Sequence, residues 1–328
     1  MDPVKENAFT LGIQEQLAHV EELGLTRFAQ EYHSTDGYLD TGNERFVNFG
    51  SNDYLGLSKN RIAVEIAIGE LQGSGIGAGA SRLVSGTRPS HNSFEKKLAN
   101  TFGSESAVVF GSGYLANVGA ISALVGRGDL IVMDRAAHAS LIDGAKISGA
   151  RLTRYLHNDL SHLKRILERS TTEQKRILIV TESVFSMDGD IAPVNEIIDI
   201  AQKFSAGILI DEAHAMGVMG KGGLGIAREF ANEGSLIRTM SMSKSLGCFG
   251  GAVLSSNQVR ALLCSKARSL LFATAIPPVL TAAAECSLQL MNDMDDERER
   301  ILGLSNLLRQ KLAHLGLETV AGESNIVP

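Results

Sequence analysis

Lys244 stands alone among small residues, because the stretch from Thr239 to Gly251 has the sequence TMSMSKSLGCFGG. A surface lysine usually has charged neighbours, whereas this one has serines before it and serine, leucine and glycine after it. Such surroundings remove much of the hydration of an amino group, which lowers its pKa toward neutrality. The pattern predicts a lysine that serves as nucleophile and base.

Asp211 and His214 lie at the end of a second promising stretch, where the apolar run GILID (207–211) leads into DEAH. Open α/β sheets bind ligands at the carboxyl ends of their strands. DEAH also occurs in nucleic-acid-dependent ATPases, but Gly220-Lys221, the one GK pair, lacks the remaining residues of a phosphate loop. A metal site that includes His138 is disfavoured, because no HxH or HExxH spacing is present. A capping aspartate and a structural histidine would also account for this motif.

Two other strand ends carry residues that suit a ligand. AVVF (107–110) runs into a glycine-serine turn, residues 111–114, and then into a helical pattern, which suits a phosphate at a helix start. His138 follows the run LIVM (130–133). Taken singly, each feature also fits a plain turn or a structural histidine. GSGIGAGASR (73–82) follows a helical pattern, not a strand, so it does not indicate a dinucleotide site.

Together these features match the requirements of a single cofactor. The sequence offers a phosphate cradle, an aspartate at a strand end, an imidazole able to lie over a ring and a solitary lysine. Pyridoxal phosphate requires that set, since a lysine binds the cofactor covalently and an aspartate keeps its pyridine nitrogen protonated.

The elements that must position these residues form an alternating pattern. Short apolar runs alternate with helical patterns from about Glu105 to Leu254, as expected for βαβ units on a mainly parallel sheet between helices. We expect an N-terminal arm and first strand in residues 1–58, a large α/β domain in 59–285, and in 286–328 a connecting helix and the start of a small C-terminal α+β lobe. LETVAG (317–322) is expected to be a strand of that lobe, which is incomplete at Pro328.

The composition disfavours some classes of binding partner and indicates where the protein is located. The 328 residues include 44% hydrophobic residues, enough for a large core, and 31 basic against 37 acidic residues give a net charge of −6. This balance provides no global basic field for nucleic acid or anionic lipid. The three cysteines lack CxxC spacing, which favours a reducing compartment. A polar N-terminus and the lack of a long apolar run predict a soluble, cytoplasmic protein.

Seven segments are similar to motifs of the α-oxoamine synthases, a family of fold-type I pyridoxal-phosphate enzymes. They are NFGSNDYLGLS (48–58), GAGASRLVSGTRPSH (77–91), GSGYLANVG (111–119), HASLIDGAKISGA (138–150), VFSMDGDIAP (184–193), DEAHAMGVMGKGGLG (211–225) and SMSKSLG (241–247). The resemblance extends from about Asn48 to Pro278.

The resemblance implies roles for residues in contact with the cofactor. Lys244 matches the lysine that binds the cofactor covalently, and Asp211 matches the partner of the pyridine nitrogen. His214 matches the histidine that reaches the phenolic oxygen, and His138 matches the one that stacks on the ring.

Further positions match the same motifs. Gly113 and Tyr114 match the phosphate turn, and Ser186 matches a hydroxyl near the cofactor. Asn52 matches an asparagine near the amino-acid carboxylate. Ser241 stands where a threonine is common and keeps the hydroxyl for the phosphate.

Thr274, in LLFATAIPP (270–278), matches a residue that a dimer partner offers to the phosphate. The resemblance therefore implies a homodimer with shared active sites. It also implies an arginine for the substrate carboxylate in the part of the C-terminal lobe that would follow Pro328.

The implied reaction is a decarboxylating condensation. An amino acid loses its α-proton to Lys244 and attacks an acyl-CoA thioester, after which CoA and carbon dioxide leave. The motifs most resemble the biotin-pathway branch, which joins L-alanine to a pimeloyl thioester, while a glycine acetyltransferase stays open. A fold-type I aminotransferase or lyase would share the lysine, the aspartate and the phosphate turn, and a non-catalytic cofactor-binding remnant would keep them as well.

Overall fold

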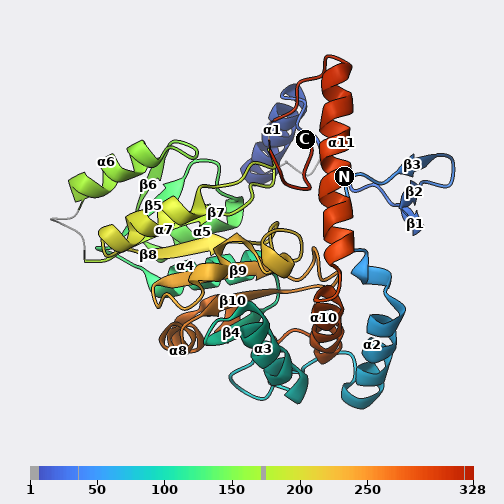
Figure 1. Cartoon of the computed structure of the whole chain (residues 1–328), viewed down its shortest axis with the longest axis horizontal. Coiled ribbons are helices and arrows are strands. Elements are labelled where there is room, and N and C mark those ends of the chain that lie inside the picture. Colours follow the sequence, from blue (N-terminus) through green and yellow to red (C-terminus); the bar gives the residue numbers. More distant parts are fainter. Residues whose placement is uncertain (1–6, 36, 171–174, 321) are drawn as a thin grey trace. The chain divides into compact units, whose positions relative to one another are not determined.

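A computed structural model describes residues 7–35, 37–170, 175–320 and 322–328 (Figure 1). The chain divides into two compact units, Met1–Ser51 and Asn52–Pro328. In the first unit, Asn7 caps helix α1 (Ala8–Glu22) by accepting a hydrogen bond from the Thr10 N–H, and α1 has no buried residue. Strands β1 (His33–Thr35), β2 (Tyr38–Asp40) and β3 (Arg45–Val47) form a small antiparallel sheet.

The second unit is built on a seven-stranded sheet with the order β4-β10-β9-β8-β7-β5-β6. Strand β10 is antiparallel to both of its neighbours, and the other described pairings of this sheet are parallel. The strands are β4 (Ser106–Phe110), β5 (Leu130–Asp134), β6 (Arg151–Tyr155), β7 (Ile177–Glu182), β8 (Gly207–Asp211), β9 (Leu236–Ser241) and β10 (Gly251–Ser255).

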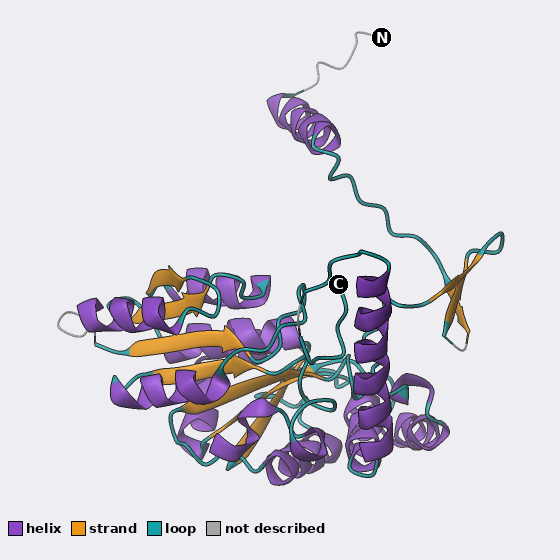
Figure 2. Cartoon of the chain, turned by 45° about the horizontal axis from the view of Figure 1, so that its top comes forward, coloured by secondary structure: helices purple, strands orange, loops and turns teal. Residues whose placement is uncertain are grey.

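Helices cover both faces of this sheet (Figure 2). Val132 and Ile179 pack with α6 and α7 on one face, while their neighbours Met133 and Val180 pack with α4, α5 and α8 on the other. Adjacent strand residues thus enter opposite cores, which explains the nearly continuous apolar runs and confirms the predicted α/β architecture. The helices are α2 (Arg61–Ser74), α3 (Pro89–Phe102), α4 (Gly113–Leu124), α5 (Ala139–Ser148), α6 (Leu160–Ser170), α7 (Val194–Lys203), α8 (Asn257–Lys266), α9 (Arg268–Leu271), α10 (Pro278–Met291) and α11 (Asp295–His314).

The C-terminal part departs from expectation in one respect. Residues 317–320 of the segment expected to be a strand have no strand partner, and residue 321 lies outside the described residues. The following segment is instead held by side chains, because Ser324 Oγ donates to the Gly189 carbonyl and Arg309 donates to the Ser324 carbonyl at 3.0 Å. The expected boundary between 285 and 286 falls within α10 and remains a proposal.

Candidate active site

The candidate active site lies where β5, β7, β8 and β9 end. His138 follows β5, Glu182 and Asp211 are the last residues of β7 and β8, and Ser241 ends β9, three residues before Lys244. Four of these five residues were predicted to belong to the site, and Glu182 was not. Parallel strands bring their carboxyl ends to one edge of the sheet, so residues distant in sequence gather there.

The Asp211 carboxylate is held in place by two donors. Its Oδ1 accepts the Ala213 N–H at 2.9 Å, and its Oδ2 accepts Asn117 Nδ2 at 2.6 Å. Asn117 is fixed in turn, because its Oδ1 accepts the Thr239 hydroxyl at 2.6 Å. All three of Asp211, Asn117 and Thr239 are buried. Sequence reasoning missed Asn117 and Thr239, although Asn117 lies one helical turn after Gly113 on α4, on the same face.

His138 and Asn117 meet at Ser140. The Ser140 N–H donates to His138 Nδ1 at 3.2 Å, with His138 as the N-cap of α5. Ser140 Oγ lies 2.8 Å from His138 Nδ1 and accepts Asn117 Nδ2 at 2.9 Å. A backbone donor to Nδ1 requires the tautomer that is protonated on Nε2. Asp211, Asn117, Ser140 and His138 therefore form one connected chain.

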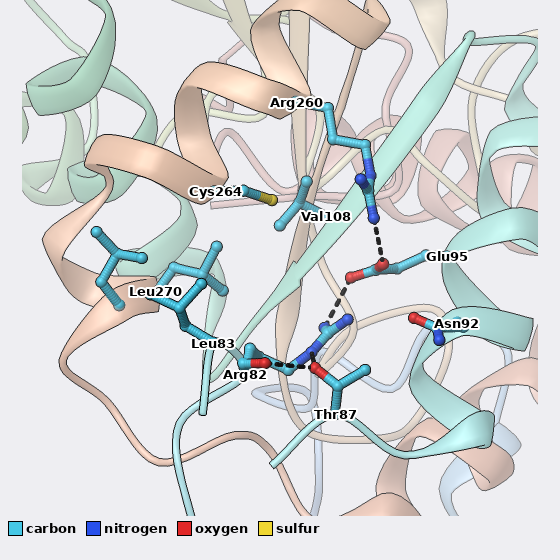
Figure 3. Close-up of a pocket in the computed structure, with 10 residues that line it drawn as sticks. Arg82, Leu83, Thr87, Asn92, Glu95, Val108, Arg260, Cys264 and Leu270 are labelled. Atoms are coloured by element: carbon cyan, nitrogen blue, oxygen red, sulfur yellow. Dashed lines mark hydrogen bonds and ion pairs between the residues drawn. The ribbon is translucent and has the colours of Figure 1, made fainter. Parts of the chain in front are cut away.

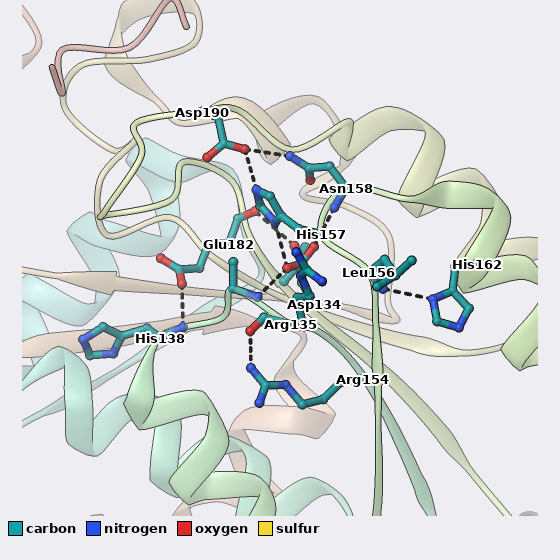
Figure 4. Close-up of polar contacts among 12 residues, drawn as sticks. Asp134, Arg135, His138, Arg154, Leu156, His157, Asn158, His162, Glu182 and Asp190 are labelled. Carbon is teal, nitrogen blue, oxygen red and sulfur yellow. Dashed lines mark hydrogen bonds and ion pairs between the residues drawn. The ribbon is translucent and has the colours of Figure 1, made fainter. Parts of the chain in front are cut away.

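The Lys244 amine has no hydrogen bond or ion pair with any other residue in the described ranges of the chain. Burial lowers its pKa, and the negative charges of Asp211 and Glu182 raise it in part, with a net lowering. The Glu182 carboxylate accepts the His138 N–H at 2.6 Å (Figure 4). Burial and then the charge of Asp211 raise the pKa of Glu182 to about 8. Lys244 thus carries an amine with a reduced proton affinity and no partner within the described structure.

Tyr54 connects His214 to Asn52, because its hydroxyl forms a hydrogen bond with each of them. The Tyr54 hydroxyl is 2.6 Å from His214 Nδ1 and donates to Asn52 Oδ1 at 3.1 Å. Burial lowers the pKa of His214 to about 3, with smaller contributions from the charges of Lys244 and His138. The ring is therefore neutral near pH 7. Tyr54 was not assigned a role from the sequence, although it stands two residues after Asn52 in the quoted motif.

The predicted phosphate turn meets the end of β9 at the start of α4. Ser112 caps the helix by accepting the Leu115 N–H at 3.1 Å. Ser241 Oγ and Ser243 Oγ lie 2.7 Å apart. A methyl group added at Gly113 would lie 3.1 Å from Ser241 Cβ, and one added at Gly251 would lie 2.4 Å from the Gly113 nitrogen. Glycine backbone, serine hydroxyls and a helix start meet at this corner, a donor set that fits a phosphate.

Tyr114, Ser186 and Thr274 lie less centrally. The Tyr114 ring is exposed and its hydroxyl donates to Asp143 on α5. Ser186 is half-buried in the loop after β7. Thr274 is exposed and forms an isolated antiparallel bridge with Ser81, and among described residues no hydrogen bond joins it to Lys244.

A pocket of about 180 Å³ lies elsewhere, around the Arg82–Glu95 ion pair of 2.7 Å (Figure 3). It contains none of the predicted site residues. Within the ranges that the structure describes, no three His, Cys, Asp or Glu side chains are grouped to hold a metal ion. The same ranges include no helix long and apolar enough to cross a membrane.

Comparison with known proteins gives consistent results. Residues 44–328 match the family model for aminotransferase class I and II. The chain is 47% identical to an 8-amino-7-oxononanoate synthase of Acidithiobacillus ferrooxidans over 266 residues, which are 80% of this chain and 68% of the relative. Identity to the enzyme of that name from Geobacter sulfurreducens is 40% over 323 residues, 97% and 82% of the two chains. A serine palmitoyltransferase variant from S. paucimobilis, solved with pyridoxal phosphate and myriocin bound, has a TM-score of 0.87 at 29% identity and covers 95% of this chain and 80% of its own.

Proposed function

The chain belongs to the aminotransferase class I and II family and, within it, to the α-oxoamine synthases, and from this premise we propose that it makes 8-amino-7-oxononanoate. The reaction joins L-alanine to the acyl group of pimeloyl-CoA, with CoA and carbon dioxide as the other products. The observation that carries the proposal is Lys244, a partly buried amine without a partner among the described residues, beside a fixed Asp211 carboxylate in a chain 47% identical to such a synthase.

Pyridoxal phosphate is the cofactor of this family, and the residues present fit it. Gly113 and the Ser241 and Ser243 hydroxyls would hold its phosphate, and Asp211 would hold its ring nitrogen. Ser186 and Tyr114 are also proposed to contact the cofactor, because they match motif positions that do so in this family. When bound, the cofactor supplies a ring that withdraws electrons from the bonds of the substrate α-carbon.

The chain's own residues supply proton transfer and orientation. The Lys244 amine, with its lowered pKa, is suited to take the proton from the substrate α-carbon. The Asp211 carboxylate is a hydrogen-bond acceptor fixed before substrate arrives, so no reorganisation is needed at the moment of reaction. His138 is proposed to lie on the cofactor ring. His214 is neutral and so can both donate and accept hydrogen bonds.

We propose that Asn52 binds the carboxylate of the amino acid. Its Oδ1 already accepts the Tyr54 hydroxyl at 3.1 Å, which leaves the Nδ2 donors for an anion. Burial raises the pKa of the Tyr54 hydroxyl to about 12, so this group stays uncharged well above neutral pH. Asn52 is therefore held in one orientation by a neutral neighbour.

The test is a product survey by mass spectrometry. The protein is incubated with pyridoxal phosphate and pairs of amino acids (alanine, glycine, serine) and acyl-CoA thioesters (pimeloyl, acetyl, palmitoyl). L-alanine with pimeloyl-CoA should give the 8-amino-7-oxononanoate mass and release CoA, and Lys244→Ala should abolish both. Preferred use of glycine with acetyl-CoA would identify a glycine acetyltransferase instead. Cofactor binding without turnover of any pair would refute a catalytic role.

Borohydride treatment of the loaded protein checks the role of Lys244 separately. Peptide mapping should find the pyridoxyl group on Lys244. Attachment to Lys221 or another lysine would contradict the assignment.

We also propose a homodimer in which Thr274 of one chain completes the phosphate site of the other. Thr274 lies in a surface rich in exposed apolar side chains, since Phe272, Leu83 and Val84 are 74%, 69% and 79% exposed. Large apolar patches of this kind mark interfaces. A cytoplasmic location is proposed because the three cysteines are free.

Mixed dimers test this arrangement. Lys244→Ala and Thr274→Ala chains, mixed and allowed to exchange, should form heterodimers with one site free of both changes. The mixture should regain synthase activity above the mean of the two parents. Equal or lower activity would remove Thr274 from the site.

A further inference from the structure

Four polar side chains beside the candidate active site form a cluster that the proposed reaction does not use. Asp134, His157, Asn158 and Asp190, here called the His157 cluster, join the ends of β5 and β6 to the loop after β7 (Figure 4). His157 Nδ1 lies 2.9 Å from Asp134 Oδ1, and its Nε2 lies 2.8 Å from Asp190 Oδ2. A neutral imidazole donates through one nitrogen only, so two facing carboxylates select the imidazolium.

Asn158 also links Asp134 to Asp190. Its N–H donates to Asp134 Oδ2 at 3.0 Å, and its Nδ2 donates to Asp190 Oδ2 at 2.8 Å. This arrangement places Asn158 at φ 53°, in the left-handed region that asparagine tolerates better than most residues. Asp190 Oδ2 thus accepts two donors from the turn after β6, while its buried Oδ1 has no partner in the described structure.

The anchored segment is the loop Ser183–Ala192, here called the β7–α7 loop, which carries Ser186. Its ends are joined because the Ala192 N–H donates to the Ser183 carbonyl at 3.0 Å. Closer to Ser186, the Phe185 N–H donates to the Asp190 carbonyl at 3.0 Å. The Phe185 ring meets the His157 ring edge-on, with centroids 4.4 Å apart. His157 therefore contacts the residue before Ser186 and the aspartate that closes the loop.

We propose that His157, as an imidazolium shared by Asp134 and Asp190, is a positioning residue that fixes the β7–α7 loop and thereby places Ser186 for the cofactor. The inference rests on the proposed function in so far as it concerns Ser186. Its structural part does not depend on that function. This part is the pair of charged contacts that His157 makes with Asp134 of β5 and Asp190 of the loop, here called the pin.

The pin is sensitive to pH. The charged groups that face His157 are Asp134 from β5 and Asp190 from the loop, and the charge of Asp134 also acts weakly on Glu182 of β7. Burial lowers the pKa of His157, but the hydrogen bonds and charges of Asp134 and then Asp190 outweigh it, so the net pKa is raised. The stabilisation is complete below the ordinary histidine pKa and is lost as pH rises through the raised value of the folded state. Deprotonation removes one of the two donors.

Hydrogen exchange of the β7–α7 loop in the unloaded protein tests the pin, and cofactor titration tests its consequence. His157→Gln and Asp190→Asn should each lower loop protection and pyridoxal phosphate affinity by about tenfold or more. His162→Gln is the matched control, because His162 Nδ1 accepts the Leu156 N–H at 3.1 Å outside the cluster. In the wild type, loop protection corrected for intrinsic rates should fall as pH rises above the ordinary histidine pKa, and this fall should be clearly smaller in His157→Gln.

Unchanged loop protection in His157→Gln, or the same pH dependence in that variant, would overturn the proposal. If His157→Gln does not fold, Asp190→Asn and the wild-type pH series decide the question. A protein that shows the pin but no synthase activity would refute the proposed function and support the pin. Normal activity and cofactor affinity in a variant whose loop has lost protection would refute the link to Ser186.

Discussion

Replacing Asn117 with leucine removes the amide that fixes the Asp211 carboxylate and keeps the number and branching of the side-chain heavy atoms. The change deletes a 2.6 Å bond to a buried carboxylate, which contributes about 1.5–3 kcal/mol, and leaves the Thr239 hydroxyl without its acceptor, at a cost of about 1–3 kcal/mol. Asn117 and Thr239 are 2% and 1% exposed, so water cannot replace either bond. Asn117→Leu should therefore lower the free energy of unfolding by about 2.5–6 kcal/mol, a large share of a typical total of about 5–15 kcal/mol.

Urea unfolding of the cofactor-free protein measures this difference from the shift in midpoint at constant slope. Thr239→Val, alone and combined with Asn117→Leu, completes a double-mutant cycle. The double variant should lose about 1 kcal/mol less than the sum of the two single variants, because the valine leaves no hydroxyl to be stranded. Asn306→Leu, at an exposed position of α11, is the matched control and should change stability by about 0.5 kcal/mol or less. A cost for Asn117→Leu equal to that of the control would refute the inferred network.

Three further changes test other parts of the site. Asp211→Asn should keep much of the cofactor affinity and lose about 3 kcal/mol or more of transition-state stabilisation, measured as kcat/KM with L-alanine and pimeloyl-CoA, and near-normal turnover would restrict Asp211 to a structural role. The raised pKa of Glu182, about 8, makes wild-type stability fall as pH rises from about 4.5 through 8, and Glu182→Gln lacks this titration. The stability of Glu182→Gln relative to wild type should therefore be greater at pH 9 than at pH 6. An equal difference between the urea midpoints of the two proteins at both pH values would contradict this. Gly251→Ala should weaken pyridoxal phosphate binding by about tenfold or more through the added methyl 2.4 Å from the Gly113 nitrogen, whereas Gly234→Ala, with nothing within 4 Å, should bind as wild type does.

The central strands were predictable because burial on two faces imposes continuous apolar runs. AVVF (107–110) forms most of β4 and GILID (207–211) forms the whole of β8 for this reason. Strand β6 was not predicted, because its sequence RLTRY is polar and only Tyr155 of it is buried. LETVAG has strand-like residue types, yet its described residues have no sheet to join. Residue preference alone does not provide a pairing partner.

The residues proposed to take part in the reaction were predicted from the sequence, but the side chains that hold them were not. A solitary lysine and an aspartate at a strand end have a distinctive local setting. Asn117, Thr239 and Tyr54 act on partners far along the chain, since Asn117 and Asp211 are 94 residues apart and Tyr54 and His214 are 160 apart. Amides and hydroxyls leave no periodic pattern that marks such pairings. Only the folded sheet brings them together.

The position of β10 between β4 and β9 affects how the chain matures on the ribosome. Ser106 at the start of β4 bonds Ser255 at the end of β10, 149 residues later. At about 5–20 residues per second, synthesis of these residues takes roughly 7–30 s, during which β4 has no neighbour in the sheet. The proposed phosphate turn also packs against Gly251, so it is completed only after all of the parallel strands have been made. A nascent chain paused before β10 therefore leaves β4 without its neighbour in the sheet and the proposed phosphate turn incomplete, and unpaired strands of this kind are what chaperones protect.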